Sequence, residues 1–176
     1  MYPLLLLVGV TFLRIKMTIR GLTLAPPVNQ GTICVGIIKT RWNPIVVDAI
    51  VEGISTTLAQ QNVSDITIEE VGGAFELPLA ASVMAKSGKF DVIIPVGCLI
   101  KGATMHFEYI SSAAVDGLMR INLDHGIPVI NGILNVLTED QALERAGLKG
   151  DHGNEGIGWA LTAIQQVHLS RKYKSV

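Results

Sequence analysis

Short apolar runs alternate with longer amphipathic segments over residues 32–172, and no other feature limits the possible folds as strongly. Each of four apolar runs has the length of a strand and is followed by apolar residues at helical spacing. A strand that is apolar throughout is buried on both faces, and a helix between two such strands lets them run parallel. The alternation therefore predicts an α/β domain whose parallel sheet lies between two layers of helices.

The boundaries of the expected elements follow from the apolar runs and from the residues that interrupt them. The predicted strands are 32–39, 66–71, 92–98 and 128–134. The predicted helices are 43–61, which begins at an Asn cap followed by Pro, then 75–86, 104–125, 138–146 and about 156–172. Right-handed crossovers between these strands give a three-layer α/β/α sandwich with a four-stranded parallel flavodoxin-like sheet.

Length and charge exclude several classes of protein. The 176 residues suit a single domain, which we place at residues 32–176. The formal net charge is −1 and no basic block stands out, so we expect no nucleic-acid partner. Cys34 and Cys98 lie far apart without a Cys-x-x-Cys pair or a His/Cys cluster, which argues against a zinc site. We expect both thiols to be reduced and buried, as in a cytoplasmic protein.

The N-terminal extension, residues 1–31, begins with an apolar run over residues 4–13. This run is shorter than a helix that spans a bilayer and has no basic region before it, so it suits neither an anchor nor a secretory signal. Met17 opens an ordinary sequence and is a plausible start of translation. We expect no association with a membrane, although a tethered scaffold remains an alternative that deletion of residues 1–16 would test.

Ligands of such sheets bind where the strands end, which directs attention to the loops 40–43, 72–76, 97–106 and 135–138. The third is the most informative, because Gly102, Ala103 and Thr104 open a predicted helix whose free N–H groups and dipole favour an anion such as phosphate. His106 follows within one turn and has the chemistry of a proton relay near neutral pH. A plain helix cap and a solvated His are the alternatives. Ala103 stands where a P-loop needs Lys, which disfavours a nucleoside triphosphate.

Four residues elsewhere combine a plausible ligand role with an ordinary structural one. Trp42 and Phe75 offer aromatic faces to a planar heterocycle, or pack against their own helices. Glu76 is a hydrogen-bond acceptor, or favours a helix N-terminus. Arg145 suits bidentate phosphate binding, or complements the end of its helix.

Five motifs in this order resemble the lumazine synthase family over about residues 33–166. They are the segments 41–43 (Arg-Trp-Asn), 73–78 (Gly-Ala-Phe-Glu-Leu-Pro), 97–108 (Gly-Cys-Leu-Ile-Lys-Gly-Ala-Thr-Met-His-Phe-Glu), 128–132 (Pro-Val-Ile-Asn-Gly) and 139–147 (Glu-Asp-Gln-Ala-Leu-Glu-Arg-Ala-Gly). Trp42, where Phe is commoner, and the run 105–110 (Met-His-Phe-Glu-Tyr-Ile) are most similar to the fungal branch.

The resemblance implies a transferase of riboflavin biosynthesis that needs no metal or redox cofactor. It would condense 5-amino-6-(D-ribitylamino)uracil with 3,4-dihydroxy-2-butanone 4-phosphate to 6,7-dimethyl-8-ribityllumazine, phosphate and water. The resemblance makes His106 the proton-transfer residue. It assigns the pyrimidine to Trp42, Ala74, Phe75, Glu76, Cys98, Leu99, Ile100 and Asn131, and the phosphate to Ala103, Thr104 and Arg145.

The family resemblance also implies a homopentamer with active sites between subunits, where residues from Trp42 to His106 of one chain meet the fourth strand of the next. The loop 148–155 is about two residues longer than in members that form larger shells, which favours a bare pentamer. The chain departs from the family pattern at Gly72 (usually Pro), Asn131 (often Phe), Asn135 (commonly Thr) and Glu155 (Lys in many members). No role is therefore carried over to Glu155.

Two other functions fit this fold. A carrier could retain riboflavin or a lumazine by stacking on Trp42, but it would need none of Thr104, His106 and Arg145. A flavodoxin-like electron carrier would need a Ser/Thr-rich loop after the first strand, and the sequence 39–43 (Lys-Thr-Arg-Trp-Asn) is not such a loop.

Overall fold

The computed structural model describes residues 32–173 and confirms the predicted three-layer α/β/α fold. The strands are β1 (Cys34–Thr40), β2 (Asp65–Val71), β3 (Val92–Ile100) and β4 (Gly132–Val136), all parallel in the order β2-β1-β3-β4. The helices are α1 (Pro44–Gln60), α2 (Leu77–Lys86), α3 (His106–His125), α4 (Glu139–Arg145) and α5 (Glu155–Tyr173), with a 3₁₀ turn, η1, at Ala74–Glu76.

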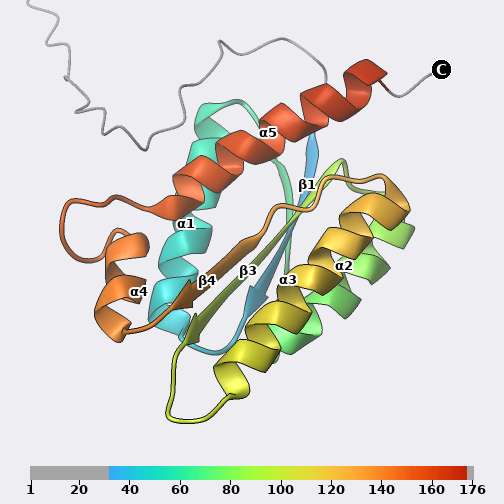
Figure 1. Cartoon of the computed structure of the whole chain (residues 1–176). Helices are drawn as coiled ribbons and strands as arrows, with labels where there is room; N and C mark the ends of the chain where they lie inside the picture. Colours follow the sequence, from blue (N-terminus) through green and yellow to red (C-terminus); the bar gives the residue numbers. More distant parts are fainter. Residues whose placement is uncertain (1–31, 174–176) are drawn as a thin grey trace, which may run out of the picture.

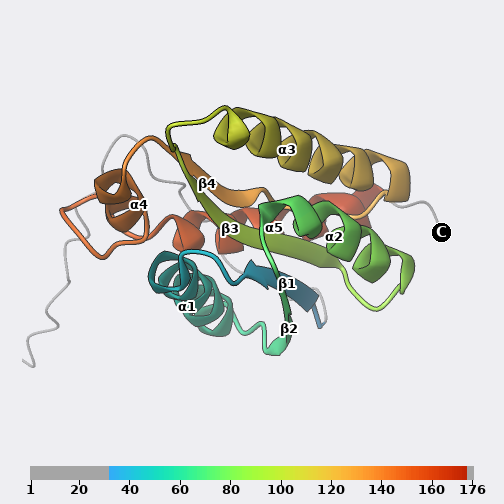
Figure 2. The ribbon, with the colours of Figure 1, turned by 90° about the horizontal axis from the view of Figure 1, so that it is seen from below.

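Helices cover both faces of the sheet. Helices α2 and α3 pack side by side on one face, and α1 packs against α5 on the other (Figure 1). The view from below shows α2 and α3 on the opposite side of the sheet from α1 (Figure 2). Each face therefore has its own core, as the apolar patterns of the strands require. The expectation that every strand is buried on both faces was wrong for β2, which lies at the edge of the sheet and has five of its seven residues exposed.

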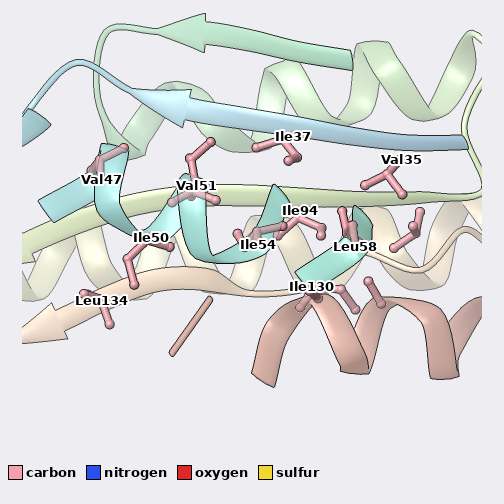
Figure 3. Packing of buried hydrophobic residues seen from close by; sticks show 14 of the residues in the cluster. Val35, Ile37, Val47, Ile50, Val51, Ile54, Leu58, Ile94, Ile130 and Leu134 are labelled. Atoms are coloured by element: carbon pink, nitrogen blue, oxygen red, sulfur yellow. The ribbon is translucent and has the colours of Figure 1, made fainter. Parts of the chain in front are cut away.

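The core beneath α1 and α5 is the larger of the two. Side chains of α1 at helical spacing, including Ile50, Ile54 and Leu58, point toward Ile37 of β1 and Ile94 of β3 (Figure 3). All five are essentially inaccessible to solvent, and burial of such a side chain contributes roughly 1.5–3 kcal/mol. On the other face, Leu77, Ala81, Ile93, Ala114 and Leu118 form the centre of the smaller core.

The predicted bounds of the fourth strand were wrong, because β4 begins at Gly132 and ends at Val136. The preceding segment pairs with β3 only briefly: Ile93 N donates to the Pro128 carbonyl, and Ile130 N donates to the Ile93 carbonyl. The next donor on β3 would be residue 95, which is a proline without an N–H. The ladder is interrupted there and resumes where Val96 pairs with Gly132.

Gly132 lies against the backbone of β3. A Cβ atom added to Gly132 would lie 2.5 Å from the carbonyl oxygen of Pro95, a distance that real Cβ atoms do not reach. The close approach of the two strands therefore requires glycine at this position.

Two predicted helices begin later than expected. The helix predicted from Thr104 starts at His106, and the segment predicted to be helical from Phe75 opens with η1 before α2 starts at Leu77. In the second case the Glu76 carboxylate accepts a hydrogen bond from Gly73 N at 2.8 Å, while Glu76 N donates to the Gly73 carbonyl at 3.2 Å. These two bonds close a tight turn in place of a regular helical one.

The apolar run at residues 4–13 and the candidate start at Met17 lie outside the described residues. Within residues 32–173, no helix is both long and apolar enough to cross a membrane.

Candidate functional site

The candidate site lies at the carboxyl edge of the sheet, where the arrowheads of β1, β3 and β4 point in Figure 1. The predicted loops between β1 and α1, between β2 and α2, and between β3 and α3 all leave from this edge. Their positions agree with the rule that open parallel sheets bind ligands at the carboxyl ends of their strands.

The loop between β1 and α1 is held to β3 by the side chain of Asn43. Asn43 is the N-cap residue of α1 in the left-handed conformation (φ 57°), but its side chain does not cap the helix as the sequence predicted. Instead Nδ2 donates to the carbonyl of Cys98 at 2.9 Å. This bond fixes the neighbouring Trp42, which remains 72% exposed and has its ring close to Gly73 of the second loop.

A chain of ion pairs supports the same loop from outside. Arg41 Nε lies 2.7 Å from Glu70 Oε1, and Lys39 Nζ lies 3.5 Å from the other oxygen of Glu70 and 2.9 Å from Asp48. The bond with Asp48 raises the pKa of Lys39, and the bond with Arg41 lowers the pKa of Glu70. Strand β2 is thereby tied to the residue next to Trp42.

The loop between β2 and α2 places its three predicted site residues in different environments. Ala74 is buried in the smaller core, whereas Phe75 is 60% exposed. Glu76 is exposed, and its carboxylate already accepts the hydrogen bond from Gly73 N. Phe75 is therefore free to contact a ligand, while Glu76 shapes the loop that presents it.

The end of β3 forms the floor of the candidate site. Cys98 is buried, and burial raises the pKa of its thiol to about 11. Leu99 and Ile100 are half-buried and pack against the two opposite cores. With Cys98 protonated and its carbonyl bound to Asn43, this segment offers a ligand mainly backbone and apolar surface.

The loop between β3 and α3 is open to solvent. Ala103, Thr104 and His106 are exposed, and His106 N donates weakly to Thr104 Oγ1 at 3.4 Å. Lys101 anchors the start of the loop, because its N donates to the Val136 carbonyl at 2.9 Å and its ammonium pairs with Glu108 of α3. This anchored, exposed helix start has donors available for an anion.

Arg145 lies at the end of α4, and its nearest acidic partner is Glu155 of α5, with Nη1 2.8 Å from Oε1. The structure shows no bond between Arg145 and the Ala103–Thr104 segment among the described residues.

Asn131 lies just before β4, exposed, with its Oδ1 accepting from Ile133 N at 3.3 Å. Because Gly132 pairs with Val96, Asn131 lies opposite Pro95, five residues or about 16 Å from the end of β3 at about 3.3 Å per residue. It therefore lies well back from the loops of its own chain.

Sequence reasoning missed the side chains that hold the site in place. The ion pair of Lys101 and Glu108, the chain of Lys39, Arg41, Glu70 and Asp48, and the bond from Asn43 to Cys98 were not predicted. One signal was present, since Lys39 and Glu70 become direct neighbours once β1 and β2 are paired in register. The other pairs depend on loop conformation, which the sequence pattern does not specify.

Both cysteines are free thiols, and Cys98 is buried as expected. For Cys34 the expectation of burial was wrong, because it is only partly buried at the opposite end of the sheet, where Sγ donates to Asp65 at 3.1 Å. No group of three or more His, Cys, Asp or Glu side chains within residues 32–173 has the arrangement of a metal site.

Comparison with known proteins supports the resemblance that the motifs suggested. The family model for 6,7-dimethyl-8-ribityllumazine synthase matches residues 32–171. A protein of that name from the fungus Schizosaccharomyces pombe is 46% identical over 132 residues, which cover 73% of this chain and 82% of the relative. Another of that name from Desulfatibacillum aliphaticivorans is 41% identical over 156 residues, or 85% and 99% of the two chains. The chain thus belongs to the 6,7-dimethyl-8-ribityllumazine synthase family.

Proposed function

We propose that the protein condenses 5-amino-6-(D-ribitylamino)uracil with 3,4-dihydroxy-2-butanone 4-phosphate to 6,7-dimethyl-8-ribityllumazine, phosphate and water. Membership of the family is the basis of this proposal. The observation that carries it is the exposed His106, next to the open Ala103–Thr104 segment at the edge of the sheet that also presents Trp42. A pyrimidine stack, an anion site and a proton relay are the three elements this reaction requires.

We assign each substrate-binding role from the burial and the contacts of the residue concerned. Trp42 and Phe75 stack on or flank the pyrimidine and its side chain, while Ala74 and Glu76 maintain the loop that presents Phe75. The end of β3 borders the heterocycle through the backbone of Cys98, Leu99 and Ile100. Ala103, Thr104 and Arg145 hold the phosphate group of the ketone.

His106 is the proposed proton-transfer residue. Imine formation removes water from a carbinolamine, and loss of phosphate requires removal of a proton from a carbon next to the imine; both steps need a group that accepts and donates protons near neutral pH. His106 lies within one turn of the proposed phosphate loop, so one side chain can serve both steps. Holding two substrates in register supplies much of the remaining rate enhancement.

The proposed assembly is a homopentamer with active sites between subunits, in the cytoplasm, built from a domain that covers residues 32–176. The outer faces of α2 and α3 support an oligomer, because Leu79, Val83, Met119 and Leu123 are exposed there. Exposed apolar surface of this kind marks protein interfaces. Asn131 would then contribute to the site of the neighbouring subunit rather than to its own, which accommodates its distance from the end of β3.

A two-substrate assay tests the function directly. The purified protein should form a fluorescent lumazine and release one phosphate per turnover when both substrates are present. Replacing His106→Ala should lower kcat by about 10²- to 10⁴-fold with a smaller change in pyrimidine affinity, since a proton relay acts mainly in the transition state. His125→Ala is the matched control, because His125 is an exposed histidine at the far end of the same helix.

Absence of product from a folded oligomer would overturn the enzyme assignment. If the protein instead retained a lumazine or riboflavin without turnover, the carrier alternative would be favoured. Equal loss of kcat and of pyrimidine affinity in His106→Ala would contradict a role in proton transfer.

A further inference from the structure

Arg145 has an acidic partner, Glu155, which also lies near a histidine. Its Nη1 lies 2.8 Å from Oε1 of Glu155, and both side chains are about one-third exposed (37% and 31%). His152 Nε2 lies 3.7 Å from the same carboxylate oxygen. The carboxylate therefore lies between two basic side chains in a setting where solvent screens charge only in part.

The backbone around Glu155 is held on both sides, so this pairing is built into the fold. Asn154 donates to the carbonyls of Ala49 at 2.7 Å and of Ala146 at 3.0 Å, and its Oδ1 accepts from Gly156 N at 2.8 Å. Gly156 is buried so closely against α1 that an added Cβ atom would lie 2.5 Å from the Ile50 carbonyl. Glu155 thus starts α5 at a fixed point above the end of α4.

The guanidinium of Arg145 keeps capacity for a second anion. It carries five N–H donors. The ion pair with Glu155 engages Nη1, and among the contacts of the described residues no other acid approaches Arg145. A phosphate group bound by the remaining donors would share the guanidinium with a carboxylate, and the two negative charges would repel each other across it.

We propose that Glu155 is a positioning residue that holds the Arg145 guanidinium in place and, through its charge, limits the affinity of that group for phosphate. This inference rests on the proposed role of Arg145 as a phosphate ligand. A limited affinity for phosphate favours turnover, because the site must bind a phosphate ester and then release inorganic phosphate. An arginine without a neutralising neighbour would hold the product more tightly.

The test is titration of the full-length protein with inorganic phosphate by calorimetry, in parallel with steady-state kinetics. Glu155→Gln keeps the shape and an oxygen acceptor for Arg145 but removes the charge. We expect its Kd for phosphate to fall by about three- to tenfold at low ionic strength, with a smaller change at high salt. The KM for the phosphorylated ketone should fall in the same direction, while the KM for the pyrimidine stays constant.

The chain offers a close control in Asp140→Asn. Asp140 lies on the same short helix and pairs with Lys149 at 2.7 Å, so this variant removes one carboxylate charge without touching Arg145. Its Kd for phosphate should equal that of the parent. Glu155→Asp keeps the charge and should stay near the parent value. Glu155→Ala removes both the charge and the acceptor for Arg145, so comparison with Glu155→Gln separates the effect of the charge from that of positioning.

Each outcome separates this inference from the proposed function. Unchanged or weaker phosphate binding in Glu155→Gln, with binding abolished in Arg145→Ala, overturns the role of Glu155 alone. Full phosphate binding in Arg145→Ala overturns the role of Arg145 and this inference with it. Tighter phosphate binding in Glu155→Gln by a protein that forms no lumazine supports the inference and overturns the enzyme assignment.

Discussion

The two ends of the sheet use their polar side chains in different ways. At the amino end they bind one another: Asp91 accepts from Cys34 N at 2.9 Å and pairs with Arg171 at 3.0 Å, and Arg171 donates to the Thr32 carbonyl at 2.7 Å. At the carboxyl end, Thr104 and His106 are exposed and share only one weak hydrogen bond.

This difference indicates that polar groups at one end of the sheet mainly stabilise the fold, while those at the other end are available for ligand binding. Partnered groups at the amino end fix α5 and the strand starts, whereas exposed donors at the carboxyl end are available to substrates. Several polar groups at the carboxyl end are exceptions, because they bind other parts of the protein. They include Asn43, the pair of Lys101 and Glu108, and the ion pairs that join Lys39, Arg41, Asp48 and Glu70. Substitutions at the two ends should therefore affect stability and activity differently, and the exceptions should affect both.

The largest effect on stability is expected at Asn43. Asn43→Ala removes the bond to the Cys98 carbonyl, worth about 1 kcal/mol, and replaces Asn, which tolerates the left-handed region, by a residue that does not, at a cost of up to about 1–2 kcal/mol. Chemical denaturation should show a total loss of about 2–3 kcal/mol, and the KM for the pyrimidine should rise because Trp42 is no longer held. Asn43→Gly avoids the strain and should lose only about 1 kcal/mol; an equal loss in both variants would refute the contribution of the backbone conformation.

A smaller effect on stability, without an effect on activity, is expected at Asp91. Asp91→Ala removes the acceptor of Cys34 N and the partner of Arg171, and we expect a loss of about 1–2 kcal/mol because the carboxylate is partly exposed. For a chain of this length, thermal melting should shift by roughly 2–4 °C per kcal/mol. The kcat and both KM values should stay constant, and a change in kcat would break the proposed division between the two ends.

The smallest expected effect is a difference in reactivity between the two thiols, which can be measured on the protein without any substitution. Burial raises the pKa of Cys98 to about 11, so at pH 8 only about one thiol in a thousand is ionised. Cys34 is more accessible, so iodoacetamide should label it first, as mass spectrometry of the peptides can follow. In urea both should react at similar rates.

Because the folded pKa of Cys98 is raised, its contribution to stability is complete below the ordinary thiol pKa and is lost as pH rises toward about 11.

Most of the fold could be predicted from periodicity. Apolar runs identified β1, β3 and β4, and Asn43-Pro44 located the start of α1, because local sequence determines these features. Strand β2 was also located, although it contains Thr and Glu residues and is mostly exposed rather than buried on both faces. The start of β4 could not be predicted, since it depends on Pro95 lying opposite residues 130–132 of another strand. Local patterns carry no information on such register.

The candidate site was predicted less completely. The exposed loop 102–106 was predicted, because a strand followed by Gly-Ala-Thr and a helix specifies its place in the fold. The partner of Arg145 was not, since Glu155 reaches it only because Asn154 fixes the loop between α4 and α5. Glu155 departs from the residue common in the family, so the resemblance alone gave it no role.

The contact between Gly132 and the Pro95 carbonyl also limits how this protein can evolve. A clash with a side chain can be relieved by a smaller neighbour, but here the obstacle is main chain, 2.5 Å from the Cβ atom of any other residue. No substitution at position 95 removes a carbonyl oxygen. Position 132 therefore has no compensating partner in the described chain, and variation in β4 has to arise at the residues that follow it.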